Sequence, residues 1–526
     1  MNDLLDELRA ITGAAHVFTD GDLSAFTQDW RKRAHGKALA VVRPGSTDEV
    51  AAIVKACARH QATTGVSLVP QGGNTGLAVG SVPDASGRQV VLSLARLNAV
   101  RAIDADNLTI TVEAGCVLQT VQEAADASGL LFPLSLAAEG SCTLGGNLGT
   151  NAGGTQVVRY GNARELCLGL EVVTAQGEVW HGLSGLRKDN TGYDLRDLLI
   201  GSEGTLGIIT AATMKLYPLP KVRLTAWAAV PSLQTAVALL GLAHRHLGPG
   251  LTGFEVMGRF ALSLVDKHFE QLSVPLLNPP AAAPGRPKQG AAPTGLTPAA
   301  PRLPAQGGTG ERVVASGIGP SSEPHDVGSV GAPFFVLLEN SDHESEHHAR
   351  ALFEHLLETA MEQELVSDAV VAESLNQTRH LWHLRESIPL AQAEEGLNIK
   401  HDISIPISRI VEFVAQTDAL LAREIPGVRL VNFGHLGDGN LHYNVQAPEG
   451  IDAATFLREQ EDRVNTLVFD SVARFGGSIS AEHGIGSLKA DKLPRYKSPV
   501  ALELMRAIKR ALDPQNLLNP GRVIRS

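Results

Sequence analysis

Gly140-Ser141-Cys142-Thr143-Leu144-Gly145-Gly146-Asn147-Leu148-Gly149-Thr150-Asn151-Ala152-Gly153-Gly154 holds six glycines in fifteen residues, against 53 in the 526 residues of the whole chain. Glycine loses more conformational freedom on folding than any other residue, so such a segment is costly unless the bare backbone is needed. Backbone N–H groups that are free of side chains can converge on an anion. The stretch therefore predicts either a large, flat group lying against it or a series of tight turns between strands.

Two further glycine segments bear on this choice. They are Pro70-Gln71-Gly72-Gly73-Asn74-Thr75-Gly76-Leu77 and Gly201-Ser202-Glu203-Gly204-Thr205-Leu206-Gly207-Ile208-Ile209-Thr210. The first matches neither the GxGxxG turn of a dinucleotide fold nor the GxxxxGK[ST] phosphate loop. Three such loops in one domain nevertheless favour a bulky phosphorylated cofactor over ordinary turns.

The first of these loops follows elements that are typical of an α/β domain. An apolar strand is expected at 40–42, and Ser46 opens a helix whose apolar residues recur at helical spacing. A second apolar strand at 66–69 leads into the loop. The opening of the chain thus predicts a domain of alternating strands and helices.

Length and composition narrow the class of protein. A chain of 526 residues is too long for one core, so two or more domains are expected. The net charge of -11 argues against nucleic acid as a partner. The acidic N-terminus is unlike a signal peptide, and no apolar run reaches the length of a membrane span. The widely spaced Cys57, Cys116, Cys142 and Cys167 fit reduced thiols of a cytoplasmic enzyme.

Composition changes abruptly between 274 and 331, where Pro, Ala and Gly dominate and apolar periodicity is lost. Such a segment cannot bury enough apolar surface to offset the entropy of ordering it. The sequence predicts a disordered insertion there, of no readable function. A buried strand is expected to follow at 334–339.

The stretch Gly434-His435-Leu436-Gly437-Asp438-Gly439-Asn440-Leu441-His442-Tyr443-Asn444 predicts a β-hairpin, because Asp-Gly is a strong signal for a type I′ turn. With this pair at the tip, His435 lies opposite His442 with Cβ atoms roughly 5 Å apart. Two imidazoles that converge from a rigid hairpin suit a metal ion. A surface hairpin with two solvated histidines remains the alternative.

A carboxylate and a third histidine follow in Ser480-Ala481-Glu482-His483-Gly484. This segment is either a turn or the source of a hard ligand and a base. Two imidazoles and a carboxylate with open positions suit zinc, manganese or iron(II). The same set could serve a zinc hydrolase, but HExxH is absent and the three glycine loops would be left unexplained.

Two more motifs carry a resemblance to a known family. They are Lys188-Asp189-Asn190-Thr191-Gly192-Tyr193-Asp194-Leu195 and Leu512-Asp513-Pro514-Gln515-Asn516-Leu517-Leu518-Asn519-Pro520-Gly521. With the three loops, they resemble the vanillyl-alcohol oxidase type of FAD-linked oxidoreductase, in its D-lactate and D-2-hydroxyglutarate dehydrogenase branch. The resemblance covers most of 35–270 and 332–526. It implies an α+β fold: a two-subdomain FAD-binding domain at 1–220, a substrate (cap) domain with an antiparallel sheet at 221–485, and a segment at 486–526 that returns to the first domain.

The resemblance also implies that the FAD pyrophosphate rests on the first two loops. The expected cofactor-binding residues are Pro70, Gln71, Gly72, Gly73, Asn74, Thr75, Gly76, Leu77, Gly140, Ser141, Thr143, Gly145, Gly146, Asn147, Thr150, Asn151, Gly153, Gly154, Glu203, Gly204, Gly207, Ile208, Ile209 and Asn519. Some relatives carry a flavin-linking histidine where this chain has Asn74. Noncovalent FAD is therefore expected.

The matching histidines and glutamate of the family bind a divalent metal near the flavin, which implies a metal site at His435, His442 and Glu482. The hydroxyl proton of a 2-hydroxy acid must leave as its hydride is transferred. A divalent ion can lower the pKa of bound water from ~15.7 to ~7 and would acidify an alcohol in the same way. A neutral imidazole suits proton removal near pH 7, so His483 is expected to be the general base.

Three residues are candidates for holding the substrate. Arg385 and Lys400 match basic residues that receive the distal carboxylate in dicarboxylate-oxidising relatives, and Asn444 matches a substrate-holding position. Solvated surface charge is the commoner role of any single Arg or Lys. Some relatives have a hydroxyl residue where this chain has Pro389, so D-lactate or another D-2-hydroxy acid stays open beside the five-carbon dicarboxylate.

The leading prediction is an FAD- and metal-dependent D-2-hydroxy-acid dehydrogenase, of D-2-hydroxyglutarate or D-lactate type. It would pass electrons to a quinone, a cytochrome or an electron-transfer flavoprotein rather than to NAD. It is expected to be cytoplasmic, or peripheral to a membrane through its acceptor, and a homodimer is left open. A zinc-dependent hydrolase and a catalytically silent flavin-binding protein are the alternatives.

Overall fold

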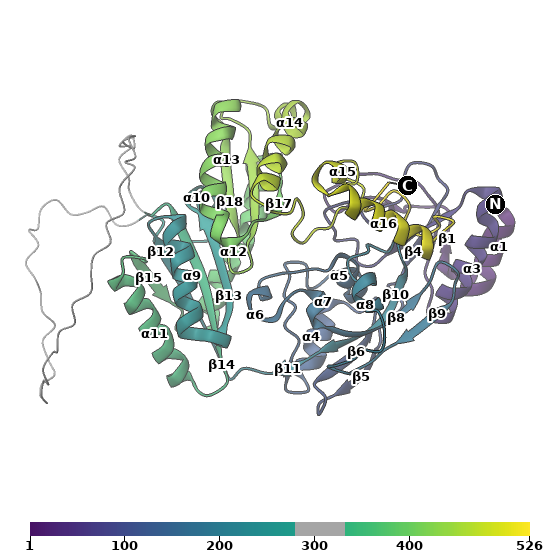
Figure 1. The fold of residues 1–526 in the computed structure, drawn as a ribbon, viewed down its shortest axis with the longest axis horizontal. Helices are drawn as coiled ribbons and strands as arrows, with labels where there is room; N and C mark the ends of the chain where they lie inside the picture. Colours follow the sequence, from purple (N-terminus) through teal and green to yellow (C-terminus); the bar gives the residue numbers. More distant parts are fainter. Residues whose placement is uncertain (279–331, 526) are drawn as a thin grey trace, which may run out of the picture.

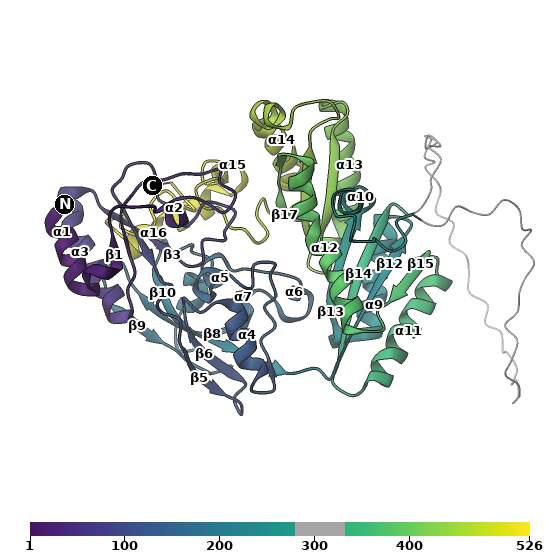
Figure 2. The same ribbon diagram turned by 180° about the vertical axis from the view of Figure 1, so that it is seen from behind.

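The computed structural model describes residues 1–278 and 332–525, which form two domains side by side (Figure 1). The N-terminal domain contains β1 to β11 and takes up α15 and α16 from the end of the chain, so both termini lie in it (Figures 1 and 2). The cap domain contains β12 to β19. The α+β architecture expected from the sequence is confirmed. No helix of the described residues is long and apolar enough to cross a membrane.

The N-terminal domain begins with a four-stranded sheet. Its order is β1 (Val17–Phe18), β2 (Ala38–Val42), β4 (Gln89–Ser93) and β3 (Ser67–Gln71), and the last three strands are parallel. The Ser46 hydroxyl caps α3 (Thr47–Thr64) by accepting the Glu49 N–H at 3.2 Å. The strands and the cap lie where the sequence predicts them, and β3 runs directly into the first glycine loop.

A second sheet of this domain is antiparallel, with the order β5 (Val100–Asp104), β6 (Thr109–Glu113), β10 (Ile208–Lys215), β8 (Cys167–Val173) and β9 (Val179–Gly182). A two-stranded sheet joins β7 (Leu130–Leu131) to β11 (Tyr217–Pro218). The helices of the domain are α1 (Asn2–Thr12), α2 (Ser24–Thr27), α4 (Leu118–Asp126), α5 (Leu144–Thr150), α6 (Val157–Tyr160), α7 (Ala163–Leu166), α8 (Leu195–Leu199), α15 (Leu493–Tyr496) and α16 (Pro499–Leu512). All four cysteines are free and buried in this domain.

The cap domain is one antiparallel sheet with helices on both faces. The strand order is β15 (Asp368–Val371), β12 (Val222–Val230), β14 (Phe334–Asp342), β13 (Leu251–Gly258), β18 (Arg429–His435), β19 (Asn440–Gln446) and β16 (Asn398–Ile399), with β17 (Asp402–Ser404) also paired to β19. Its helices are α9 (Leu233–Leu247), α10 (Arg259–His268), α11 (Glu346–Glu362), α12 (Leu375–Glu395), α13 (Ile410–Glu424) and α14 (Ala453–Arg474).

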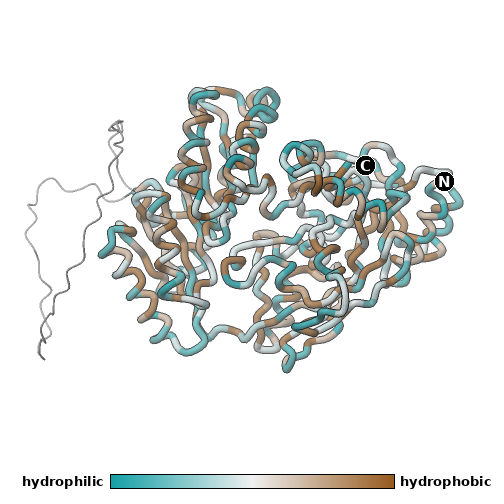
Figure 3. Tube along the Cα trace, in the orientation of Figure 1, coloured by the Kyte–Doolittle hydropathy of each residue, from teal (hydrophilic) through white to brown (hydrophobic). Residues whose placement is uncertain are grey.

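The two faces of this sheet have separate apolar cores, because side chains alternate between faces along each strand. Ala226 and Ala228 of β12 belong to the core that α9, α11, α13 and α14 cover, whereas Trp227 and Ala229 belong to the core that α10 and α12 cover. Hydrophobic segments accordingly follow the strands inside both domains (Figure 3). Glu255 alternates with Val256 on β13, so it shares the face of Met257, which α10 and α12 cover.

The predicted insertion at 274–331 falls mostly on 279–331, outside the described residues. The prediction is wrong for its first residues. Val274 and Leu277 are 7% and 3% exposed and pack into the core beneath α10 and α12. These two apolar side chains continue the cap core up to the start of the proline-rich run at Pro279.

Glu395 ties together three elements of the cap domain. Its carboxylate lies 2.6 Å from Lys267 Nζ and 2.8 Å from His268 Nε2, both on α10, and 2.6 Å from an Arg429 terminal nitrogen on β18. Burial would raise the pKa of Glu395, but hydrogen bonds from Lys267, Arg429 and His268 lower it to about 2. The folded state therefore favours the ionised carboxylate.

Glu395→Gln is expected to lower the free energy of unfolding at pH 7 by roughly 1–3 kcal/mol. A lowered folded-state pKa contributes stability above the unfolded pKa near 4.5, and this stability is lost as the pH falls toward about 2. The difference in free energy of unfolding between wild type and variant should therefore be constant above pH 5 and should shrink as the pH falls below 4.5. Urea unfolding across this range measures it. The exposed Glu394→Gln is the control, and an equal loss there would contradict the prediction.

Candidate active site

The three glycine loops surround one pocket in the N-terminal domain, and the open space within its walls, about 970 Å³, includes solvent at the mouth. The Thr143 hydroxyl in the pocket wall is buried and has no hydrogen-bond partner among the described residues. An unpaired hydroxyl in a pocket lined by three glycine loops fits a ligand that carries phosphate oxygens, such as FAD.

Glycine is required where the first two loops touch. A Cβ on Gly73 would lie 2.1 Å from the Ser141 carbonyl oxygen, which no side chain can tolerate. The Asn74 amide fixes the same loop from the other side. It donates to the Ala25 and Gln28 carbonyls and accepts from the Ser81 hydroxyl at 2.9 Å. The pocket wall is thus preformed by contacts within the protein.

Most of the residues predicted to bind the cofactor line this pocket. Those that do are Pro70, Gln71, Gly72, Gly73, Asn74, Thr75, Gly76, Thr143, Gly145, Gly146, Asn147, Thr150, Glu203, Gly204, Gly207, Ile208 and Ile209. Those that lie outside its wall are Leu77, Gly140, Ser141, Asn151, Gly153, Gly154 and Asn519. Lining residues that the sequence did not single out include Ala78, Gly80, Ser81, Leu94, Ala114, Cys142, Gly149 and Ser202.

Two of the residues outside the wall have other contacts. The Asn519 amide donates to the carbonyls of Gly80 and Glu203, so it joins the C-terminal motif to the loops that form the pocket. Gly154 donates its N–H to the Glu482 carboxylate at 2.8 Å. Gly154 therefore holds a predicted metal ligand of the neighbouring segment and does not face the cofactor pocket.

Gly149 offers a test of the pocket as the flavin site. It lies in the pocket wall, and a Cβ there would meet no protein atom within 4 Å. Gly149→Val should therefore fold but displace most of the FAD, because its side chain takes up ligand space. The ratio of flavin to protein absorbance after gel filtration measures this loss. Gly241→Val on α9, where a Cβ also has room, is the control, and full flavin retention by Gly149→Val would contradict the assignment.

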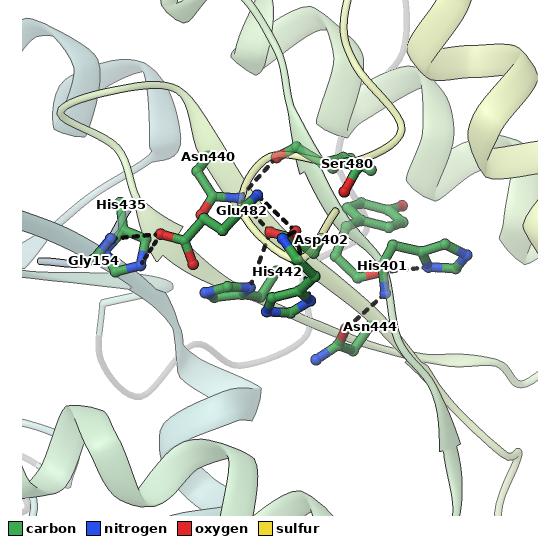
Figure 4. A network of polar contacts seen from close by, with 12 residues as sticks. Gly154, His401, Asp402, His435, Asn440, His442, Asn444, Ser480 and Glu482 are labelled. Atoms are coloured by element: carbon green, nitrogen blue, oxygen red, sulfur yellow. Dashed lines mark hydrogen bonds and ion pairs between the residues drawn. The ribbon is translucent and has the colours of Figure 1, made fainter. Parts of the chain in front are cut away.

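The predicted metal ligands come together beside this pocket (Figure 4). Donor atoms of His435, His442 and Glu482 lie within 4.8 Å of one another. The His435 and His442 rings are 5.5 Å apart, and His435 Nε2 is 3.6 Å from a Glu482 oxygen. This is the donor set that a catalytic divalent ion uses, with two imidazoles and one carboxylate.

The hairpin that carries the two histidines differs in register from the prediction. The structure pairs Phe433, and not His435, with His442. The loop between the strands therefore runs from Leu436 to Gly439 and is longer than a two-residue turn. Since side chains alternate with a period of two, a shift of two residues leaves both histidines on the same face. They meet as diagonal neighbours.

Asp402 is a central residue that the sequence did not single out. Its carboxylate accepts the backbone N–H groups of Glu482 and His483, each at 2.9 Å, and the Asn440 amide at 3.0 Å. Burial would raise the pKa of Asp402, but His483, Lys489 and His442 hold it below its usual value. The ionised carboxylate thus anchors the Glu482–His483 segment. Its pairing with His442 across β17 and β19 could not be seen without the sheet.

His483 connects the two parts of the site. Its side chain lines the cofactor pocket, while its ring stacks on His442 at 6.2 Å and 16°. His483 Nδ1 lies 3.5 Å from an Asp402 oxygen. The negative charge of Asp402 favours a proton on this nearer ring nitrogen over one on Nε2, which lies on the other side of the ring.

Glu203 holds this segment against the N-terminal domain. It belongs to the third glycine loop, and its carboxylate accepts the N–H groups of Ile485 at 2.7 Å and Gly486 at 2.8 Å. Burial raises the pKa of Glu203 against the opposing effect of these hydrogen bonds. The loop of the FAD pocket and the chain that carries His483 are therefore bonded directly.

The three predicted substrate-holding residues are placed differently. The Arg385 guanidinium is 6% exposed and lies over the Phe433 ring at 5.0 Å, next to His442. Lys400 has no hydrogen bond or ion pair with any described residue, and burial and the nearby Arg31 lower its pKa to about 8. The Asn444 amide bonds to the His401 N–H and the Gln392 side chain, which leaves one of its N–H groups available.

Comparisons with known proteins agree with this arrangement. The model for the C-terminal domain of FAD-linked oxidases matches 219–523, and the FAD-binding domain model matches 38–182. The chain is 39% identical, over 95% of its length and 92% of the relative, to the D-2-hydroxyglutarate dehydrogenase of Xanthomonas citri pv. viticola. It is 34% identical to the enzyme of that name from Stutzerimonas stutzeri, over 99% of this chain and 98% of the relative.

A solved structure of p-cresol methylhydroxylase with substrate bound shares the fold. It superposes with a TM-score of 0.70 over all of this chain and 97% of its own, at 16% identity. The family models and the relatives identify an FAD-linked oxidoreductase, and its two-domain fold is that of p-cresol methylhydroxylase. The chain belongs to the FAD-linked oxidase family, and the two relatives named above are D-2-hydroxyglutarate dehydrogenases.

Proposed function

We propose that this protein oxidises a D-2-hydroxy acid, most simply D-2-hydroxyglutarate, to the 2-oxo acid, with noncovalent FAD and a divalent ion. One observation carries the proposal: His483 lines the cofactor pocket and also stacks on His442 of the metal cluster. A base in that position faces both the hydride acceptor and the ion that would hold the substrate.

The residues of the site divide the chemistry among them. His435, His442 and Glu482 would hold zinc, manganese or iron(II). When bound, FAD supplies the hydride acceptor and the ion supplies the Lewis acidity that makes a hydroxyl proton easier to remove. His483 accepts that proton at Nε2, because Asp402 occupies its Nδ1 side. Asp402 keeps His483 in place through the backbone and stabilises the imidazolium that results.

Cationic side chains favour an acidic substrate with a second carboxylate. Arg385 lies beside the histidine pair, and Lys400 has no anionic partner among the described residues. The names of the relatives also point to the five-carbon dicarboxylate. Pro389, one turn beyond Arg385 on α12, removes a hydroxyl that some relatives have there, so D-lactate is the second candidate substrate.

Noncovalent FAD is supported by the contacts of the first loop. The residue at the position of a flavin-linking histidine is Asn74, and its amide is committed to Ala25, Gln28 and Ser81. The electron acceptor would be a quinone, a cytochrome or an electron-transfer flavoprotein.

Anaerobic bleaching of the flavin tests the proposal. Flavin-loaded protein is mixed with D-2-hydroxyglutarate, its L-enantiomer, D-lactate and L-lactate. The D-2-hydroxy acids should bleach the flavin band and the L-enantiomers should not. Flavin that no 2-hydroxy acid bleaches would refute the proposal and favour a catalytically silent flavoprotein. Metal-dependent hydrolysis by a flavin-free preparation would favour a hydrolase.

A further inference from the structure

A buried glutamate lies beneath the metal cluster and outside every part of the site described above. Glu255 on β13 is 0% exposed and pairs in register with His435 on β18. One of its carboxylate oxygens lies 2.6 Å from His435 Nδ1. The other accepts the Arg385 Nε–H at 2.7 Å. A single carboxylate thus contacts both a metal ligand and an anion-holding residue.

We propose that Glu255 is a positioning residue that fixes the metal-facing nitrogen of His435 and the orientation of the Arg385 guanidinium at the same time. The inference rests on the proposed function, since it concerns how the metal and the substrate carboxylate are held. It couples two tasks, ion binding and substrate orientation, through one buried carboxylate.

The His435 contact determines which nitrogen can bind an ion. An ionised carboxylate only accepts hydrogen bonds, so His435 Nδ1 carries the proton. His435 Nε2 is then the ligand atom, and it is this atom that faces Glu482 at 3.6 Å. Carboxylates that bond to the outer nitrogen of a metal-binding histidine orient the ring and raise its basicity.

The contact of Arg385 with Glu255 leaves the two terminal nitrogens of the guanidinium free to bind a substrate carboxylate. Because Nε is taken by Glu255, the two terminal nitrogens remain to form a fork toward a carboxylate. The stacking of the guanidinium on Phe433 at 5.0 Å limits its rotation. Glu255 also offsets the charge of a cation that is only 6% exposed, which makes burial of Arg385 tolerable.

Each oxygen of the Glu255 carboxylate has one donor: one oxygen lies 2.6 Å from His435 Nδ1, and the other accepts the Arg385 Nε–H at 2.7 Å. A glutamine at this position would have only one acceptor oxygen for two donors. It can keep the Arg385 bond and reach His435 through its own N–H only if the His435 proton moves to Nε2, and a protonated Nε2 cannot bind an ion. An aspartate keeps both acceptor oxygens, but its shorter side chain places them farther from His435 and Arg385.

A matched control lies on the neighbouring strand. Glu339 of β14 is also buried, at 5% exposed, and also bonds to α12, through Trp382 Nε1 at 3.2 Å. Its carboxylate has no hydrogen bond or ion pair with His435 or Arg385, and its other side-chain partner is the Thr252 hydroxyl. Glu339→Gln therefore measures the purely structural effect of neutralising a buried glutamate beneath α12.

The experiment compares Glu255→Gln, Glu255→Asp and Glu339→Gln in the flavin-loaded enzyme. Competition with a chromophoric chelator gives the Kd for zinc(II), and steady-state assays give KM and kcat for D-2-hydroxyglutarate and D-lactate. Glu255→Gln should raise the zinc Kd by about 10- to 100-fold and raise KM, with flavin content unchanged. Glu255→Asp should recover part of both losses. Glu339→Gln should lower Tm but leave the zinc Kd and KM unchanged.

Two results would overturn the proposal: wild-type zinc Kd and KM in Glu255→Gln, or equal changes of both in Glu339→Gln. A different set of results would show that the proposed function itself is wrong. Wild-type protein that binds no zinc(II), and whose flavin no 2-hydroxy acid bleaches, would refute the proposed function, and the positioning role of Glu255 with it. Wild-type protein that binds zinc while Glu255→Gln binds it equally well would refute the role of Glu255 alone.

Discussion

Replacing His435 by alanine is expected to abolish turnover of a D-2-hydroxy acid while leaving the FAD bound. His435 belongs to the proposed metal-binding set of His435, His442 and Glu482, whereas the flavin pocket is lined mainly by loops of the N-terminal domain. Loss of one imidazole leaves His442 and Glu482, which is too few ligands for a catalytic ion. A metal contributes several kcal/mol of transition-state stabilisation, so the rate should fall by roughly 10³-fold or more.

Metal analysis and anaerobic flavin reduction measure this effect. His435→Ala also removes a partner of buried Glu255, so His442→Ala is needed as a second variant that does not disturb that carboxylate. His401→Gln is the control: His401 is 1% exposed and bonds to the Tyr443 carbonyl and Asn465, outside the cluster. It should lower stability but keep metal content and rate. Full activity in either cluster variant, or in chelator-treated wild type, would remove the metal from the mechanism.

Local patterns in the sequence were enough to predict the cofactor loops and much of the N-terminal domain. The strand that leads into the first loop, the Ser46 cap and the glycine segments are all properties of short stretches. The face shared by His435 and His442 could also be predicted, because it depends only on alternation along two adjacent strands. The register could not, because the turn residues Asp438 and Gly439 belong to a longer loop.

The residues that the sequence did not reveal are those whose partners are distant along the chain. Glu255 and His435 are 180 positions apart and meet only because β13 pairs with β18. Asp402 meets Glu482 and His483 across 80 and 81 positions. Neither Glu255 nor Asp402 belongs to a sequence motif with the spacing of metal ligands. From the sequence alone, each is most simply interpreted as a member of an ordinary ion pair. The residues that hold the site in place meet through contacts between segments distant in sequence. Local periodicity does not predict such contacts.

His483→Ala is expected to slow flavin reduction by about 10²- to 10⁴-fold, the usual contribution of a general base. Metal and flavin should both stay bound, because Asp402 still anchors the backbone N–H of residue 483 when the ring is removed. The loss should therefore appear in the reduction step itself and not in cofactor content. Anaerobic stopped-flow mixing with D-2-hydroxyglutarate measures that step directly.

Chemical rescue separates loss of the base from a distorted site. Removal of the ring opens space between the FAD pocket and His442, on which His483 stacks at 6.2 Å. Added imidazole should enter this space and restore part of the reduction rate in His483→Ala, with little effect on wild type. His483→Gln, whose side chain occupies the space but is a poor base, should stay slow and resist rescue. An unchanged reduction rate in His483→Ala would assign the proton to another group, because no distortion could leave the rate intact while removing its base.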